Sequence, residues 1–263
     1  MLDIRNVYKT FAPGTVNEKR VLKGLSLHMK PGDFATVIGS NGAGKTTLFN
    51  AIAGTFLTDE GQIFIGGEDM TFKPETYRAR VIGRIFQDTM MGTAPNMTIE
   101  QNLAIAYAST KKGLRPAITR ADRAYFRETL ARLNMGLEDR MKTKMGLLSG
   151  GQRQAITLLM AVIVTPDILL LDEHTAALDP LTAEKVLAIT KEVVAEKNIT
   201  TLMITHNIAS ALELGNRTLM MDDGQIVLDL SGDERASLSV EGLLQKYREV
   251  KGKMLDNDRI LLS

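Results

Sequence analysis

One nine-residue segment restricts the fold of this chain more than any other: Gly39, Ser40, Asn41, Gly42, Ala43, Gly44, Lys45, Thr46 and Thr47. It follows a short, apolar, β-branched stretch over residues 34–39 and precedes a helical pattern over 45–53, which Gly54 ends. The glycines let backbone N–H groups turn inward around a phosphate, and the helix adds the positive end of its dipole. The pattern G-x-x-x-x-G-K-[ST] in this context predicts a site for a nucleoside triphosphate.

Two side chains of this P-loop and two acidic residues suit that chemistry. Lys45 supplies a mobile cation for the β and γ phosphates, and the Thr46 hydroxyl is placed to bind Mg²⁺. Asp172 ends the apolar stretch 168–171; its carboxylate can hold Mg²⁺, and Glu173 beside it can act as a general base toward an attacking water. Alternatively, the two acids only mark the end of a strand, but the P-loop favours the metal site.

Strand and helix patterns alternate through the second half of the chain. We expect buried strands over residues 168–171, 201–204 and 218–221, with helices over 152–164 and 182–195 before the first two. This alternation predicts the doubly wound α/β core of a P-loop NTPase (RecA-like), a parallel sheet with helices on both faces.

The remaining segments predict additions to this core. Short strands over residues 2–7, 21–29, 61–65 and 81–86, separated by turn signals, predict an antiparallel β subdomain. Residues 98–140 show several helical patterns and predict an inserted helical subdomain. The tail 231–263 is helical in pattern around 240–250 and has no recognisable chemistry.

Composition excludes several classes of protein. The 263 residues include no cysteine, which removes disulfide scaffolds, thiolate nucleophiles and Cys-based zinc sites and favours the reducing cytosol. The formal net charge of +1 gives no reason to expect a polyanion-binding surface, so no nucleic acid partner is expected. The longest apolar stretch, residues 155–164, is well short of the roughly 20 residues of a spanning helix, and no secretory signal is visible.

A second phosphate-binding motif, Leu148, Ser149, Gly150, Gly151 and Gln152, begins the helix expected at 152–164. A serine and two glycines at a helix N-terminus form an anion-binding nest. Located between a P-loop and an Asp-Glu strand, this pentapeptide resembles the signature of ATP-binding cassette (ABC) proteins. The resemblance covers about residues 2–229, with the motifs in the family's order. The motif argues against a P-loop kinase that phosphorylates a small molecule.

The resemblance implies roles for further residues. Gln87 is the glutamine that senses Mg²⁺ and the nucleotide state, and His206 is the switch histidine that contacts the γ-phosphate. Residues 176–179 are the D-loop at a dimer interface. Phe11 falls where the family places an aromatic ring stacked on adenine, with Tyr8 as a nearby, structural alternative.

The resemblance also implies a head-to-tail dimer, either a homodimer or a paired cassette. Ser149, Gly150 and Gly151 of one subunit close on the ATP and Mg²⁺ held by the P-loop of the other. His174 replaces the proline that many family members have after the catalytic glutamate, and we interpret it as loop variation rather than as a second base.

We therefore expect one ABC ATPase domain over residues 1–263. Its parts are a nucleotide-binding core at 1–87 and 166–230, a helical signature subdomain at 88–165 and a C-terminal tail at 231–263. The resemblance implies the ATP-hydrolysing subunit of a membrane transporter, at the cytoplasmic face of the cell membrane. Separate permease subunits and a substrate-binding protein are the expected partners, and import of an amino acid is favoured. The alternative is a soluble ABC ATPase acting on nucleic acid, ribosomes or protein assemblies.

Two surface features could serve a partner. Residues 88–97, after Gln87, form the family's usual coupling region and contain three methionines, although core packing also explains them. Residues 111–144 carry ten basic and four acidic residues. This basic lobe suits an anionic membrane leaflet or an acidic partner, but a solvated helix face explains it more simply.

Overall fold

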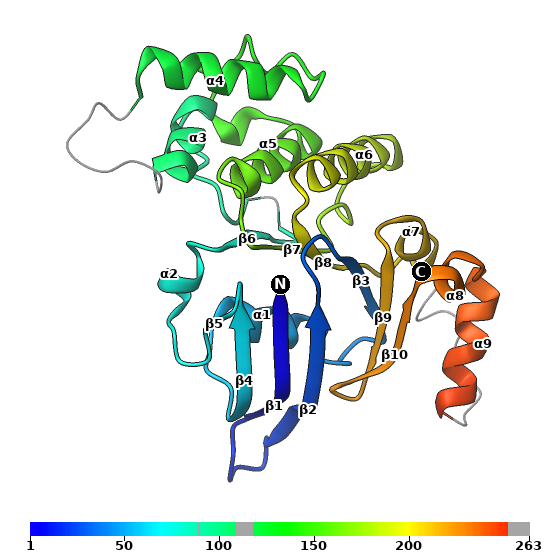
Figure 1. Cartoon of the computed structure of the whole chain (residues 1–263). Coiled ribbons are helices and arrows are strands. Elements are labelled where there is room, and N and C mark those ends of the chain that lie inside the picture. Colours follow the sequence, from blue (N-terminus) through cyan, green and yellow to red (C-terminus); the bar gives the residue numbers. More distant parts are fainter. Residues whose placement is uncertain (89, 109–117, 252–263) are drawn as a thin grey trace.

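The central element is a six-stranded sheet in the order β10-β9-β3-β8-β7-β6 (Figure 1). The computed structural model describes residues 1–88, 90–108 and 118–251. Strands β3, β6, β7, β8 and β9 are parallel, and β10 is an antiparallel edge. The strands are β3 (Phe34–Gly39), β6 (Ile82–Ile85), β7 (Ile168–Asp172), β8 (Thr200–Ile204), β9 (Arg217–Asp222) and β10 (Gln225–Ser231).

Alternate residues of the central strands enter different cores because strand side chains alternate between faces. On β7, Ile168 and Leu170 pack with α1 (Lys45–Ala53), whereas Leu169 and Leu171 pack with α5 (Gly150–Val162) and α6 (Pro180–Lys197). Helices therefore cover both faces of a largely parallel sheet. The predicted α/β core is confirmed.

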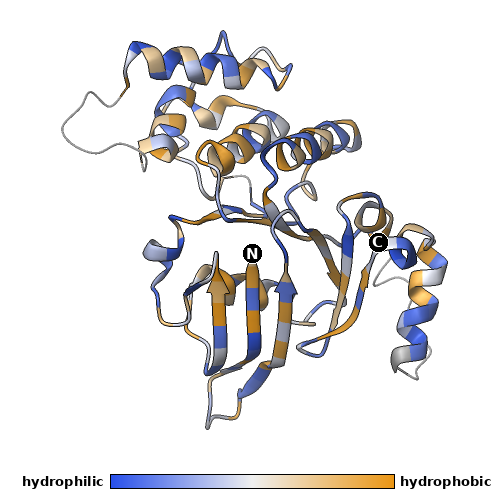
Figure 2. Cartoon of the chain, in the orientation of Figure 1, coloured by the Kyte–Doolittle hydropathy of each residue, from blue (hydrophilic) through white to orange (hydrophobic). Residues whose placement is uncertain are grey.

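A second, antiparallel sheet closes over α1 in the order β2-β1-β4-β5. It comprises β1 (Leu2–Phe11), β2 (Lys19–Met29), β4 (Glu60–Ile65) and β5 (Glu68–Asp69); the short helix α2 (Glu75–Arg78) follows. Hydrophobic and hydrophilic residues alternate along its strands (Figure 2), and the buried hydrophobic ones belong to the same core as α1. The predicted antiparallel subdomain is confirmed for the first three expected strands.

The fourth of those strands was placed in the wrong sheet. Residues 81–86 contain β6, which pairs in parallel with β7, from Ile82 opposite Ile168 to Ile85 opposite Leu171. The sequence of an edge strand reveals its apolar face but not the direction of its partner, so pattern alone could not separate the two sheets.

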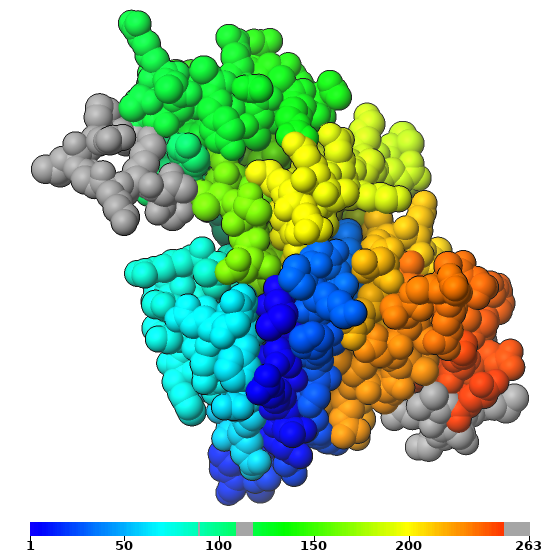
Figure 3. All heavy atoms as spheres, in the orientation of Figure 1, coloured from blue at the N-terminus to red at the C-terminus, as the bar shows by residue number. Residues whose placement is uncertain are grey.

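The helical insertion forms a separate lobe above the sheets (Figure 3). It contains α3 (Ile99–Tyr107), α4 (Arg120–Ala131), the 3₁₀ turn η2 (Met145–Leu147) and α5. Leu103, Phe126 and Ile156 lie in its own apolar core. Because α5 contributes to this core and also covers the central sheet, it joins the lobe to the rest of the molecule.

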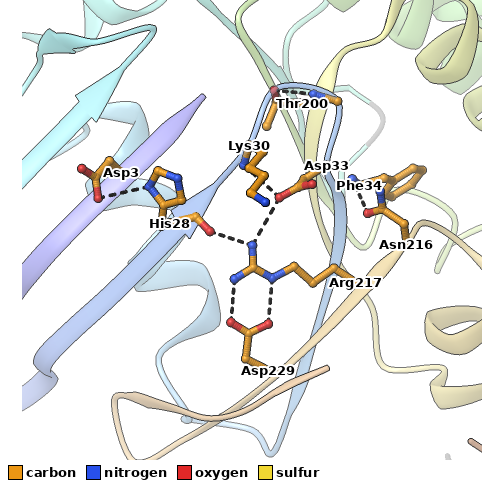
Figure 4. Close-up of polar contacts among 10 residues, drawn as sticks. Asp3, His28, Lys30, Asp33, Phe34, Thr200, Asn216, Arg217 and Asp229 are labelled. Carbon is orange, nitrogen blue, oxygen red and sulfur yellow. Dashed lines mark hydrogen bonds and ion pairs between the residues drawn. The ribbon is translucent and has the colours of Figure 1, made fainter. Parts of the chain in front are cut away.

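Arg217 joins the two sheets through polar contacts (Figure 4). Its guanidinium binds both carboxylate oxygens of Asp229, at 2.7 and 2.6 Å, and reaches Asp33 at 3.3 Å. It also donates to the main-chain carbonyl of His28, at the end of β2, at 2.6 Å. These bonds tie β2 to the starts of β3 and β9.

The C-terminal part packs on the side of the sheet that carries α7 (Ile208–Glu213). It forms α8 (Gly232–Ala236) and α9 (Val240–Lys251), so the helical pattern expected around 240–250 is confirmed. Within the described ranges, no helix has the length and apolar character needed to span a bilayer. How the chain divides into subdomains at residues 87, 165 and 230 stays a prediction.

Candidate functional site

The carboxyl ends of parallel strands deliver the expected site residues to one edge of the central sheet. Strands β3, β8 and β7 are aligned so that Val37, Ile204 and Asp172 lie side by side. The P-loop follows β3, His206 follows β8 and Glu173 follows β7. Ligands of open α/β sheets bind at this edge, beyond the strand ends.

The P-loop backbone adopts conformations that glycine permits. Gly39, Gly42 and Gly44 have φ angles of 151°, 82° and 100°, which residues with a Cβ rarely adopt. At Gly39, a Cβ would also lie 2.2 Å from the Met221 carbonyl oxygen. The glycines are thus required by the turn that leads into α1.

Helix α1 presents its first N–H groups to the loop. Its first internal hydrogen bond runs from the Leu48 N–H to the Gly44 carbonyl at 2.8 Å. The N–H groups of residues 44–47 precede it and have no acceptor within the helix. Four such donors at the positive end of a helix form a site for a phosphate group.

The Lys45 ammonium lies folded against the loop. It donates to the carbonyls of Gly39 at 2.6 Å and Ser40 at 3.0 Å. Burial lowers the pKa of Lys45, while the charges of Glu173 and Asp172 act in the opposite direction. The lysine therefore stands between the loop and the two acids, where a triphosphate could replace its carbonyl partners.

Glu173 and His206 are in direct contact at the same edge. Their Oε1 and Nε2 atoms lie 2.5 Å apart. Glu173 has a φ of 45° and its N–H donates to the Ile204 carbonyl at 3.1 Å, so the backbone is anchored to β8 in a left-handed conformation. This anchoring directs a carboxylate and an imidazole from adjacent strands toward each other.

Asp172 is buried beside these groups. Burial raises the pKa of its carboxyl, and the charge of Glu173 raises it further, while Arg84, Lys45 and His206 counteract both effects. A cation bound here would stabilise the ionised form. Thr46 and Gln87 add a hydroxyl and an amide, and such oxygen atoms are the ligands that Mg²⁺ prefers.

One pocket of about 360 Å³ unites the P-loop with residues from four other segments. Its lining includes Phe11 and Lys19 from β1 and β2, together with Glu173 and His206. Phe11 is 39% exposed, and its ring packs edge-on against Phe56, with centroids 5.3 Å apart. An aromatic face at one end and phosphate-binding groups at the other suit a purine nucleotide.

Tyr8, the alternative to Phe11, has structural contacts. Its ring lies under the Arg20 guanidinium at 4.5 Å, and its hydroxyl packs against Gly24. Gln87 is exposed just beyond β6 and is not among the residues that line the nucleotide pocket. The lining includes most of the residues expected around the phosphates and the base. The expected residues outside it are Gly39, Ser40 and Ala43 of the P-loop, together with Gln87 and Asp172 at the same strand edge.

The signature motif caps α5. The Ser149 hydroxyl accepts from the Gln152 N–H, and the Gln152 side chain accepts from the Ser149 N–H, both at 3.3 Å. Ser149 and Gly150 are exposed. Gly151 is buried against Thr182, whose Cγ2 would lie 1.9 Å from an added Cβ. No signature residue lines the pocket of its own P-loop among the described residues.

Two neighbouring segments have structural contacts. In the expected D-loop, the Asp179 side chain accepts from the Thr182 N–H at 3.1 Å and caps α6. His174 is 2% exposed, and its Nε2 lies 3.3 Å from the Thr190 hydroxyl. Burial lowers the pKa of His174 to about 4, so the ring is neutral and faces the interior.

Sequence reasoning missed Arg84. The guanidinium donates to Asn50 of α1 at 2.6 Å and lies 4.5 Å from the Phe86 ring, and its charge acts on Asp172. Burial lowers its pKa. The only sequence signal was a charged residue inside an apolar strand.

Several basic residues in the described part of the basic lobe form ion pairs with acidic residues of the same chain. Arg123 and Lys142 bind Glu100, at 3.2 and 2.6 Å, and Arg127 binds Asp139. Lys111, Lys112 and Arg115 lie outside the described residues. Internal ion pairs thus account for part of this charge.

Comparison with known proteins agrees with this geometry. The sequence pattern of the ABC transporter family matches residues 22–176. The chain is 39% identical to the tyrosine transport ATP-binding protein of Clostridioides difficile over 247 residues, 94% of this chain and 98% of the relative. It is 35% identical over 254 residues to the aliphatic sulfonates import ATP-binding protein 2 of Agrobacterium fabrum, 97% of this chain and 88% of that protein.

The fold of this chain is also similar to that of a solved ATP-binding cassette. An ATP-binding cassette in a dimeric, post-hydrolysis state with bound ADP and Pi superposes with a TM-score of 0.76. The two sequences are 27% identical, and the match covers 88% of this chain and 98% of the other. The chain therefore belongs to the ABC transporter family as an ATP-binding cassette ATPase.

Proposed function

We propose that this ATPase is the energy-supplying subunit of a membrane importer and works as a dimer on separate permease subunits. The observation that carries the proposal is the division of the phosphate-binding surfaces. The P-loop shares a pocket with Glu173 and His206, while the exposed Ser149 and Gly150 lie outside it. Two copies placed head to tail would complete each other's sites.

Within one site, each residue has a defined task. The N–H groups of residues 39–47 and the Lys45 ammonium hold the phosphates, and Phe11 stacks on the adenine. Glu173 accepts a proton from the attacking water, and His206 orients Glu173 and the γ-phosphate. Thr46, Asp172 and Gln87 would hold Mg²⁺, which supplies charge neutralisation on the phosphate oxygens.

The dimer is supported by the signature and by a relative. In the partner's site, the cap formed by Ser149, Gly150, Gly151 and Gln152 would present α5 N–H groups to the γ-phosphate. The solved cassette with ADP and Pi is itself described as dimeric. ATP would favour the closed dimer because only the triphosphate contacts both surfaces, and hydrolysis would release it.

A groove between β6 and the helical lobe is the site that we assign to the permease. It has a volume of about 270 Å³, and its lining includes Arg80, Gly83, Gly92, Ile105 and Met160. Ile105 is 56% exposed. Met90 and Met91, which directly precede Gly92 in the sequence, are 41% and 51% exposed. Apolar side chains around a groove suit an amphipathic helix from a membrane subunit at the cytoplasmic membrane face.

The cargo that we propose is an amino acid, with tyrosine as the first candidate. This choice rests on the name of the Clostridioides difficile relative, which is 39% identical over 94% of this chain. The name of the Agrobacterium fabrum relative suggests a different cargo, an aliphatic sulfonate. Uptake of radiolabelled tyrosine by cells lacking the chain tests this choice, with sulfonate uptake as the control. Loss of sulfonate uptake alone would reassign the cargo.

ATP-dependent dimerisation tests the mechanism. Glu173→Gln should bind ATP, lose turnover and run in light scattering at twice the mass of one chain. The double variant Lys45→Ala, Glu173→Gln should stay monomeric because it lacks the phosphate-binding ammonium. Undiminished turnover in Glu173→Gln would refute the base assignment.

Co-purification from native membranes tests the partner. We expect a polytopic membrane subunit, lost when Ile105 is changed to Asp in the groove. Recovery of ribosomes or nucleic acid instead would support the alternative, a soluble ABC ATPase.

A further inference from the structure

Arg235 of α8 is a buried cation bound only by neutral oxygens. Its side chain donates to the Thr218 hydroxyl at 2.8 Å and to the carbonyls of Ala211 at 3.0 Å and Leu214 at 2.5 Å. The residue is 9% exposed, and no ion pair among the described residues includes it. A guanidinium is costly to bury, so this placement needs its hydrogen bonds.

The bound carbonyls belong to the end of α7. This helix has free carbonyls at its C-terminus and a partial negative charge there, which a cation stabilises. At its other end, the Asn207 side chain accepts from the Ser210 N–H at 2.9 Å and caps the helix. His206 immediately precedes that cap. One short helix therefore connects the Arg235 contacts with the switch histidine.

The same contacts reach the strand that carries the P-loop. Thr36 of β3 donates to the Ala211 carbonyl at 2.9 Å, and its hydroxyl lies 3.2 Å from that of Thr218. All of these groups are buried. Ala211 thus has partners on β3 and on α8, which fixes the end of α7 from two sides.

Apolar packing holds the same helix from α9. Ile208 and Ala211 of α7 share a core with Leu243, Leu244 and Tyr247 of α9. Figure 1 shows α7, α8 and α9 side by side at the edge of the molecule. These tail helices lie beyond residues 22–176, where the family's sequence pattern matches.

We propose that Arg235 is a positioning residue for ATP hydrolysis: by clamping the C-terminal end of α7, it holds His206 against Glu173. The proposal rests on the proposed roles of these two residues in hydrolysis. Without the guanidinium, the Leu214 carbonyl loses its donor and Ala211 retains its bond from Thr36. The helix can then tilt about its remaining contacts, which moves His206 away from the 2.5 Å contact. Small displacements of catalytic groups reduce rate strongly.

Steady-state ATP hydrolysis by the full chain tests the clamp. Arg235→Met, which keeps the length and removes the donors, should lower kcat about tenfold, with the KM for ATP and the Kd for a fluorescent ATP analogue unchanged. Arg235→Lys should recover part of the loss because an ammonium can reach some of the oxygens. The control is Lys246→Ala, which removes the exposed Lys246–Glu234 ion pair of the same tail and should leave kcat unchanged.

An imidazole resonance provides a readout that does not depend on turnover. The chain has three histidines, so ¹⁵N spectra of labelled protein can resolve His206. Arg235→Met should shift the His206 signals and leave those of exposed His28 in place. If folded Arg235→Met keeps wild-type kcat and an unmoved His206 signal, the proposal is refuted. If His206→Ala retains full turnover, the proposed histidine role fails, while the resonance still tests the clamp separately.

Discussion

His174 makes the stability of this protein depend on pH through one buried ring. The Thr190 hydroxyl donates to the Val186 carbonyl at 2.8 Å, so it can only accept from His174 Nε2, which must carry the proton. Nδ1 is buried and has no hydrogen-bond partner among the described residues. Protonation would therefore place a charge and an unsatisfied N–H in the interior. This is why burial lowers the pKa of His174 to about 4.

The expected size of the effect follows from linkage. In the unfolded chain, the pKa of His174 is the ordinary histidine value near 6.5. Between pH 6.5 and 4, the unfolded chain therefore binds a proton at His174 that the folded chain does not bind. Stability from this residue is present above pH 6.5 and is lost as the pH falls toward 4. At about 1.4 kcal/mol per pH unit, the loss between pH 7 and pH 4.5 is about 2.5 kcal/mol.

Urea unfolding followed by far-ultraviolet circular dichroism measures this loss. The free energy of unfolding of His174→Gln should fall by about 2.5 kcal/mol less than that of the wild type between pH 7 and pH 4.5. Carboxyl groups titrate in the same range, but they are common to both proteins and cancel in the comparison. The exposed residue His28 gives the control, and His28→Gln should follow the wild type. Parallel curves for wild type and His174→Gln would refute the reasoning.

Two further predictions test the fold and the nucleotide pocket. Arg78→Met should lower the free energy of unfolding by about 3 kcal/mol, because the buried guanidinium is the donor to four backbone carbonyls, including that of Ala51 at 2.7 Å. The exposed neighbour gives the control, Arg80→Met, and equal urea midpoints for the two variants would contradict this account. Phe11→Ala should raise the Kd for ATP severalfold and leave that for tripolyphosphate unchanged, whereas Tyr8→Ala should not select between these ligands. Equal weakening of both ligands in Phe11→Ala would rule out adenine stacking.

Much of the site could be predicted from sequence because its chemistry lies in short, contiguous motifs. A glycine-rich turn between a strand and a helix has only a few backbone solutions, so Gly39 and Lys45 indicate phosphate binding before any tertiary contact is known. The acidic pair Asp172 and Glu173 can be recognised in the sequence for a similar reason, because an apolar strand leads directly into it. Phe11 was found only through the family resemblance, because nothing local marks it.

The polar interior was not predictable in the same way. In the sequence, Arg78, Arg84 and Arg235 look like ordinary surface cations. In the structure, Arg78 and Arg235 are buried and Arg84 is half-buried, and each has partners on other segments. The carbonyl partners of Arg235 lie more than 20 residues earlier in the chain. Sequence patterns describe neighbours along one element, whereas burial of a charged group depends on which elements meet.

By itself, the sequence identified the motifs of this ATPase: a phosphate-binding loop, an acidic pair that we propose as metal ligand and general base, and a second helix end that we propose for anion binding. The tertiary structure decided where these groups meet. It placed β6 in the parallel sheet, paired Glu173 with His206 and kept the signature out of its own chain's pocket. Strand direction and sheet order depend on contacts between distant segments, and an alternating apolar pattern carries no information about them.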